Sequence, residues 1–184
     1  MFFHHFHREK RVKNNLNAIR VVGSTFTSME DISKSTVDYF HRMYMDDGID
    51  SSVLSNSISP CISVHENEDL TASPFEQEVK EALFSLNMDS AVGSDGFGNN
   101  FFMFYWDILH VDVTNAVREY FLSRSIPHGA NSNFISLISK IDNAVEIGDF
   151  RPIAIRNTIS KIIRKILVIR LERILRDIIT PNQF

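Results

Sequence analysis

Two short groups of residues in this chain have side chains of the kind that bind metal ions. Tyr44-Met45-Asp46-Asp47 contains paired aspartates, which hold Mg²⁺ when a tight turn between strands presents them. His4-His5-Phe6-His7 contains three imidazoles, which are common zinc ligands. We interpret both groups as incidental, because the aspartates fall at the end of a predicted helix and the histidines stand at the start of the chain without a cysteine near them. The sequence therefore predicts no metal site.

A third group consists of cations that could contact phosphate. Residues 150–184 contain eight Lys or Arg and two acids, and residues 1–20 contain five Lys or Arg and one acid. Residues 21–149 contain six Lys or Arg and 20 acids. A basic block beside an acidic body is suggestive of contact with a polyanion, and it is also typical of a solvated amphipathic helix. Charge alone leaves both interpretations open.

Composition limits the classes of function. A chain of 184 residues, 43% of them hydrophobic, can build one domain with a modest core. The single cysteine, Cys61, excludes an internal disulfide and a multi-cysteine zinc site. No apolar run has the length of a membrane span, because Lys165 and Arg170 interrupt the longest one. The first residues lack the pattern of a signal peptide, so we expect an intracellular protein, in the nucleus or the cytoplasm.

The elements that must position these residues are mainly helices. Apolar spacing predicts helices over residues 30–45, 74–87, 99–109, 111–124 and 158–178. Ser73-Pro74-Phe75-Glu76 predicts a capping box for the second of them, and Asn157 or Thr158 is expected to cap the last.

Two apolar runs, residues 134–140 and 152–155, predict the strands of one β-hairpin, with Pro152 at an edge or a strand start. Residues 47–72 are rich in Ser, Asn and Asp and predict a linker. The expected fold class is therefore α+β, mainly helical.

Five segments between Glu76 and Phe184 occur in an order that resembles the start of the reverse transcriptase of non-LTR (LINE-type) retrotransposons, especially those of plants. They are Glu81–Asn87, Ser90–Phe97, Asn131–Lys140, Asp149–Ile153, and Asn157–Leu171 followed by Thr180–Phe184. Residues 2–46 resemble, less specifically, the segment that precedes the polymerase in such elements. The chain accordingly divides into a linker-like segment with one helix, residues 1–70, and the N-terminal part of a reverse transcriptase domain, residues 71–184.

The resemblance implies a partial fingers subdomain of a right-hand polymerase, ending before the palm, with RNA or an RNA/DNA hybrid as partner. It implies that Arg151 and Lys140 contact the incoming nucleotide, because fixed cations suit a triphosphate. It implies that the loop of Gly93, Asp95 and Gly96 lies against the template, where glycine permits close approach to a sugar-phosphate chain. Val92, Ser94 and Ser139 replace prolines that are usual in the family, which leaves the chain less constrained there.

The helix predicted at 158–178 offers further cations, independently of the resemblance. Lys161, Arg164 and Lys165 could contact a nucleic-acid backbone, although the broad apolar face of this helix serves mainly the core.

The function that these features imply is that of a truncated, reverse-transcriptase-like protein of retrotransposon origin. Polymerisation needs palm aspartates that hold two Mg²⁺ ions, and the 184 residues contain no matching segment. We therefore expect no cofactor in this chain, with Mg²⁺ belonging to a complete family member, and no polymerase activity of the chain alone. The alternative is a non-enzymatic RNA- or protein-binding module derived from such a fragment.

Overall fold

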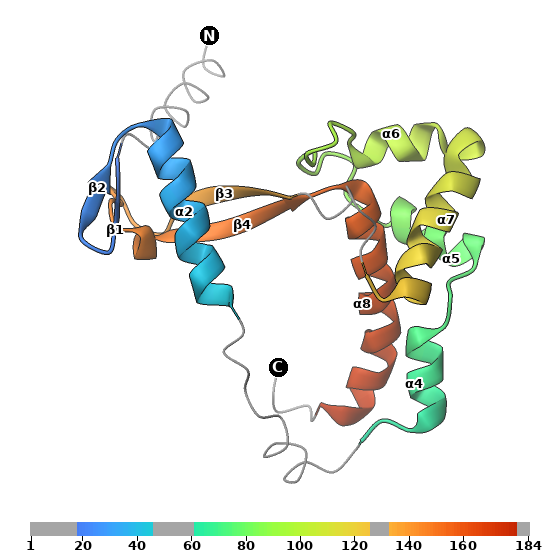
Figure 1. Cartoon of the computed structure of the whole chain (residues 1–184). Helices are drawn as coiled ribbons and strands as arrows, with labels where there is room; N and C mark the ends of the chain where they lie inside the picture. The colour runs from blue at the N-terminus through green and yellow to red at the C-terminus, as the bar shows by residue number, and fades with distance from the viewer. Residues whose placement is uncertain (1–17, 46–60, 126–132, 180–184) are drawn as a thin grey trace. The chain divides into compact units, whose positions relative to one another are not determined.

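The computed structural model describes residues 18–45, 61–125 and 133–179 (Figure 1). The chain forms two compact units whose division does not follow chain order. Among the described residues, the first unit combines residues 18–45 with residues 135–153, and the second combines residues 61–125, 133–134 and 154–179. The proposed boundary near residue 70 stays a prediction. The histidines of His4–His7 and the aspartate pair Asp46-Asp47, which we interpret as incidental, lie outside the described residues.

The first unit is built on a hairpin and one helix. Strands β1 (Ile19–Val21) and β2 (Ser24–Phe26) are antiparallel, and Gly23 at the turn between them has a φ of 81°. Helix α2 (Met29–Tyr44) confirms the expected helix, and the Ser28 Oγ caps it by accepting from the Asp31 N–H at 3.1 Å. The core of this unit contains Ile19, Val21, Ile32, Phe40, Ile147 and Phe150.

A second hairpin confirms the strands predicted between residues 134 and 155. Strand β3 (Asn133–Ser139) pairs with β4 (Phe150–Arg156), and the 3₁₀ helix η1 (Ile147–Asp149) precedes β4. The Lys140 N–H donates to the Asp149 carbonyl at 2.7 Å. The expectation of a single hairpin was wrong, because β1–β2 was missed. Its strands are only three residues long, and the Arg20 N–H donates to a residue far along the chain, the Val145 carbonyl, at 2.7 Å.

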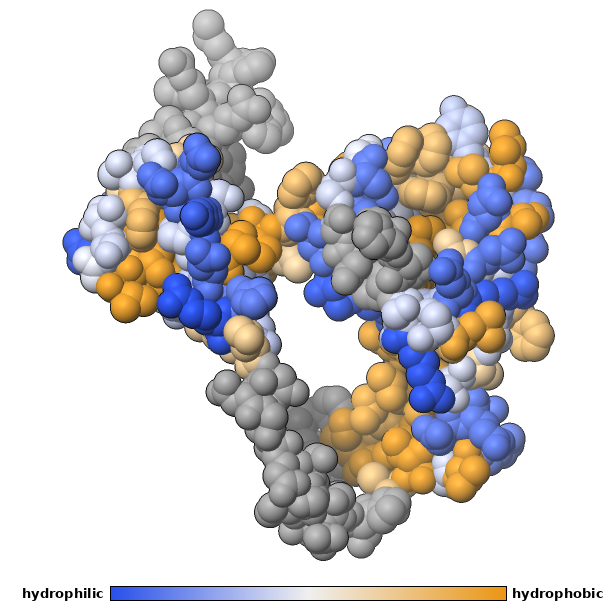
Figure 2. Space-filling model, in the orientation of Figure 1, coloured by the Kyte–Doolittle hydropathy of each residue, from blue (hydrophilic) through white to orange (hydrophobic). Residues whose placement is uncertain are grey.

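The second unit is a group of helices around α8 (Thr158–Ile178), which confirms the longest predicted helix. Helices α5 (Glu76–Phe84), α6 (Asn99–Phe104) and α7 (Trp106–Ser123) correspond to the other predicted helices, with shifted ends. Val79, Leu83, Trp106, Val117, Ile162 and Ile166 are among the side chains buried where α5, α7 and α8 meet. Other hydrophobic side chains remain on the surface, over α6 and over the C-terminal half of α8 (Figure 2).

The capping box lies elsewhere than the sequence predicted. It closes the start of α4 (Val64–Thr71), a helix inside the predicted linker, where the Ser63 Oγ accepts from the Glu66 N–H and the Glu66 carboxylate accepts from the Ser63 N–H. Residues 72–75 are not helical, and α5 starts at Glu76 without a side-chain cap. Tertiary contacts explain this: the Arg118 guanidinium donates to the Pro74 carbonyl at 2.9 Å, and Arg170 donates to the Ala72 carbonyl at 2.6 Å.

Arg170 connects α8 to the segment before α5. Its guanidinium donates to both Glu78 carboxylate oxygens at 2.7 Å and lies over the Phe121 ring, 4.9 Å from the centroid. The fold class is thus mixed and mainly helical with two small antiparallel hairpins. Its identity as a fingers subdomain stays a prediction.

Candidate nucleic-acid interface

The loop that resembles a template loop forms a tight turn. The Gly96 N–H donates to the Gly93 carbonyl at 3.2 Å, and the Phe97 N–H donates to the Asp95 carboxylate at 3.0 Å. Gly96 has a φ of 80°, which glycine adopts without strain. Asp95 and Gly96 are exposed on the outside of this turn, and Gly93 is buried beneath it.

The start of α8 holds this turn in place. The Asn157 Oδ1 accepts from the Ser94 hydroxyl at 3.2 Å and from the Asp95 N–H at 3.3 Å. Asn157 is the N-cap residue, as expected, but its side chain bonds the loop and makes no cap hydrogen bond. A Cβ at Gly93 would lie 2.6 Å from both the Cα and the N of Asn157. Glycine is therefore required at 93 by contact with Asn157 within the fold.

Two buried polar residues fasten the ends of the loop. The Thr158 hydroxyl donates to the Asn99 Oδ1 at 3.1 Å, and the Asn99 Nδ2 donates to the Asn87 carbonyl at 2.8 Å and to the Ser90 Oγ at 2.9 Å. Asn99 is 1% exposed. Sequence reasoning missed both roles, because a polar residue in the first turn of a helix is normally interpreted as a cap.

Lys161 also contacts the loop. Its ammonium donates to the Ala91 carbonyl at 2.7 Å and to the Ser90 Oγ at 3.0 Å. Burial lowers the pKa of Lys161, and the nearby Asp95 carboxylate partly offsets this effect. The ammonium that the sequence assigned to a nucleic-acid backbone thus has partners inside the protein.

Arg164 and Lys165 lie one turn further along α8. Arg164 is exposed and Lys165 is half-buried. Arg156, at the end of β4, is half-buried, and its pKa is lowered by burial and then by the positive charge of Arg164. Arg156 was missed from the sequence because nothing in the spacing of these two arginines showed that the charge of one would act on the other. Together they place two guanidinium groups near the start of α8.

Arg151 and Lys140, the residues that the resemblance implies contact the incoming nucleotide, lie in the first unit. Arg151 is exposed on β4, and Lys140 directly follows β3. The Lys140 ammonium donates to the Gly148 carbonyl at 2.7 Å, within the same hairpin. The hairpin therefore presents Arg151 from a strand, and it engages Lys140 with its own backbone.

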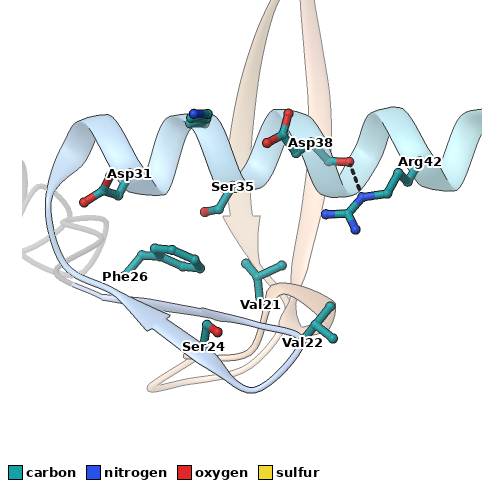
Figure 3. A pocket seen from close by; sticks show the side chains of 9 residues that line it. Val21, Val22, Ser24, Phe26, Asp31, Ser35, Asp38 and Arg42 are labelled. Atoms are coloured by element: carbon teal, nitrogen blue, oxygen red, sulfur yellow. Dashed lines mark hydrogen bonds between the residues drawn. The ribbon is translucent and has the colours of Figure 1, made fainter.

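The first unit also has a hollow of about 430 Å³ between β1–β2 and α2 (Figure 3). Val21 and Phe26 face Ser35 of α2 across it, and the Arg42 Nε donates to the Asp38 carbonyl at 3.2 Å. Its lining has two acids, Asp31 and Asp38, and two bases, Lys34 and Arg42. Because these charges balance, the hollow has no preference for an anion or a cation, and we assign it no ligand.

Two classes of site were also sought among the residues that the structure describes. No group of three or more His, Cys, Asp and Glu side chains there is placed to hold a metal ion. None of the helices in this part of the chain is both long and apolar enough to cross a membrane.

Comparison with known proteins points to a mobile element. Over 124 residues, 67% of this chain, the sequence is 29% identical to the "Transposon TX1 uncharacterized 149 kDa protein" of Xenopus laevis. The matched part is 10% of the Xenopus protein, so this chain spans a small share of that relative's length. No family model matches the chain. The similarity supports a retrotransposon origin.

Proposed function

We propose that this chain is part of the fingers region of a LINE-type reverse transcriptase, and that it binds RNA or an RNA/DNA hybrid. The observation that carries the proposal is the contact between the loop around Gly93 and the start of α8 at Asn157. These two segments are 64 residues apart, and each resembles the same family at its own position. Their interlocking, together with the transposon relative, supports a common origin for both motifs.

The binding surface would consist of the exposed rim of the loop and the two arginines. Arg164 offers a guanidinium fork that suits phosphate oxygens, and Arg156, whose pKa the charge of Arg164 lowers, adds a second positive charge before the start of α8. Asp95 and Gly96 would place backbone groups against the template strand. Lys161 would contribute indirectly, by holding the loop through Ala91 and Ser90.

Arg151 would be the nucleotide contact of a complete enzyme, with Lys140 beside it on the hairpin. The 184-residue chain alone should not polymerise nucleotides. Metal ions must stabilise the entering and the leaving oxygens, and these residues contain no segment that matches the metal-binding aspartates of the palm. Magnesium-dependent, template-directed nucleotide addition by the purified chain, lost in Arg151→Ala, would overturn this part of the proposal.

RNA binding is testable by fluorescence anisotropy with a labelled single-stranded RNA over a salt series. Arg164→Gln should lower the slope of log K against log salt by about 0.7, the value for one phosphate contact on a single strand. Arg173→Gln is the matched control, because Arg173 is an exposed arginine nine residues further along α8 and about half a turn around it. Absence of binding at low salt would contradict RNA recognition and favour the protein-binding alternative.

A further inference from the structure

The second unit has an aromatic hollow on its surface. It has a volume of about 720 Å³ and is lined mainly by Phe84, Met88, Phe101, Met103, Phe104 and Tyr105. Phe104 is 81% exposed, although its ring contacts Tyr105 at 5.0 Å between centroids. Exposed apolar side chains gathered at one hollow are typical of an interaction site.

The charges around this hollow indicate the class of its partner. The seven lining residues carry no charge, and the two segments that supply them, residues 84–88 and 100–105, are bounded in the sequence by three acids, Glu81, Asp89 and Asp107, and by one cation, Lys80. The one cation, Lys80, already lies over the Phe84 ring, 5.9 Å from its centroid. A nucleic acid would meet repulsion here, whereas a basic helix with an apolar stripe would match both the aromatic lining and the surrounding charge.

Helix α8 carries such a stripe on its exposed side. Val168, Leu171, Leu175 and Ile178 follow helical spacing, and Val168 is 55% exposed and Leu175 41% exposed. The same helix has Arg164, Lys165, Arg173 and Arg176 among its side chains. Figure 2 shows hydrophobic side chains on the surface over the C-terminal half of α8, where this stripe lies.

We propose that the exposed stripe of α8 in one copy of this chain docks into the aromatic hollow of a second copy. The two surfaces differ, so the contact is heterologous: each bound copy leaves one stripe or one hollow free for another copy. The expected product is an open chain of copies that grows with concentration. High salt should weaken it, because the charges around the hollow and on α8 are opposite.

The test uses sedimentation velocity on two variants of the full chain. Phe104→Ser removes the most exposed hydrophobic side chain of the hollow, and Leu175→Glu places a negative charge in the stripe. Each variant alone should be monomeric, whereas wild type grows in mass with concentration. Their equimolar mixture should stop at roughly twice the monomer mass, because it contains one functional pairing.

Leu122→Ser is the matched control, since Leu122 is 77% exposed on α7 and lies outside both surfaces. It should assemble like wild type. Trp106 is the sole tryptophan and packs edge-to-face on Phe84, so its fluorescence reports whether each variant is folded. Met88→Ser replaces Phe104→Ser if the latter misfolds.

Three outcomes would overturn the proposal: a wild-type chain that stays monomeric, a variant that assembles alone, or a mixture that stays monomeric. The proposed RNA binding is tested separately, because neither substitution removes a guanidinium group. Unchanged RNA affinity in both variants would show that the two surfaces act independently.

Discussion

The loop around Gly93 and the β3–β4 hairpin both carry residues that the family resemblance assigns to binding, but they are built differently. The loop is fixed by contacts with Asn157, Thr158 and Lys161, which are far from it in sequence. The hairpin presents Arg151 from a strand and engages Lys140 with its own Gly148 carbonyl. The conformation of the loop therefore depends on residues that are distant in the sequence. The position of Arg151 depends only on the strand that carries it.

The loop and the hairpin should differ most in how the free energy of unfolding responds to a glycine-to-alanine substitution. Gly93→Ala should lower the free energy of unfolding by about 2–3 kcal/mol, because its Cβ would overlap the Asn157 backbone. Gly148→Ala should change it by less than about 0.5 kcal/mol, since a Cβ there meets nothing within 4 Å. Urea unfolding followed by circular dichroism measures both. Equal effects would contradict the contrast.

Variants of Lys161 and Arg164 should distinguish two roles: Lys161 stabilises the loop, and Arg164 binds phosphate. Lys161→Met should increase amide exchange in the loop about tenfold, because the Ala91 and Ser90 oxygens lose a charged donor. Arg164→Gln should leave that exchange unchanged, as Arg164 is exposed and lies outside these contacts. Hydrogen exchange with mass spectrometry measures the loop.

The salt dependence of RNA binding tests the same distinction. The slope of log K against log salt should be as steep in Lys161→Met as in wild type, and it should be shallower in Arg164→Gln. A lower slope in Lys161→Met would mean that its ammonium leaves the loop to contact RNA, which would contradict the role assigned to it.

The hairpin cation should matter for binding and little for stability. Arg151→Ala should change the free energy of unfolding by less than about 0.5 kcal/mol, because the side chain is exposed. If the chain binds a nucleoside triphosphate, the same change should weaken binding about tenfold, the effect of one charged hydrogen bond. Isothermal titration calorimetry measures the affinity, with Arg124→Ala, an exposed arginine of the other unit, as control. A large loss of stability would show that Arg151 has a structural role.

The smallest effect should be a pH dependence of stability from Lys161. Burial lowers its pKa below the ordinary 10.5, so between the lowered value and 10.5 the unfolded chain holds a proton that the folded chain has released. Stability from this group should therefore rise as pH increases through that window. Urea unfolding at a series of alkaline pH values measures the free energy of unfolding of wild type and of Lys161→Met. The wild-type value minus the variant value should rise with pH, and a fall would contradict the direction of the pKa shift.

Local patterns predicted the regular elements well where the pattern was long. Helices α2 and α8 and the β3–β4 strands were expected near their observed positions, because their apolar spacing repeats over many residues. The three-residue strands β1 and β2 were missed because no repeat exists over such a length. Helix α4 was missed because six of its eight residues are polar and none of the eight is buried.

The sequence by itself determined the mainly helical class, the longest helix, the second hairpin and the order of motifs that resembles a reverse transcriptase. Tertiary structure alone decided that Gly93 packs on Asn157 and that the Lys161 ammonium faces the loop. The physical reason is distance along the chain. Periodicity reports neighbours within a few turns, whereas Asn157 and Lys161 find their partners more than 60 residues away.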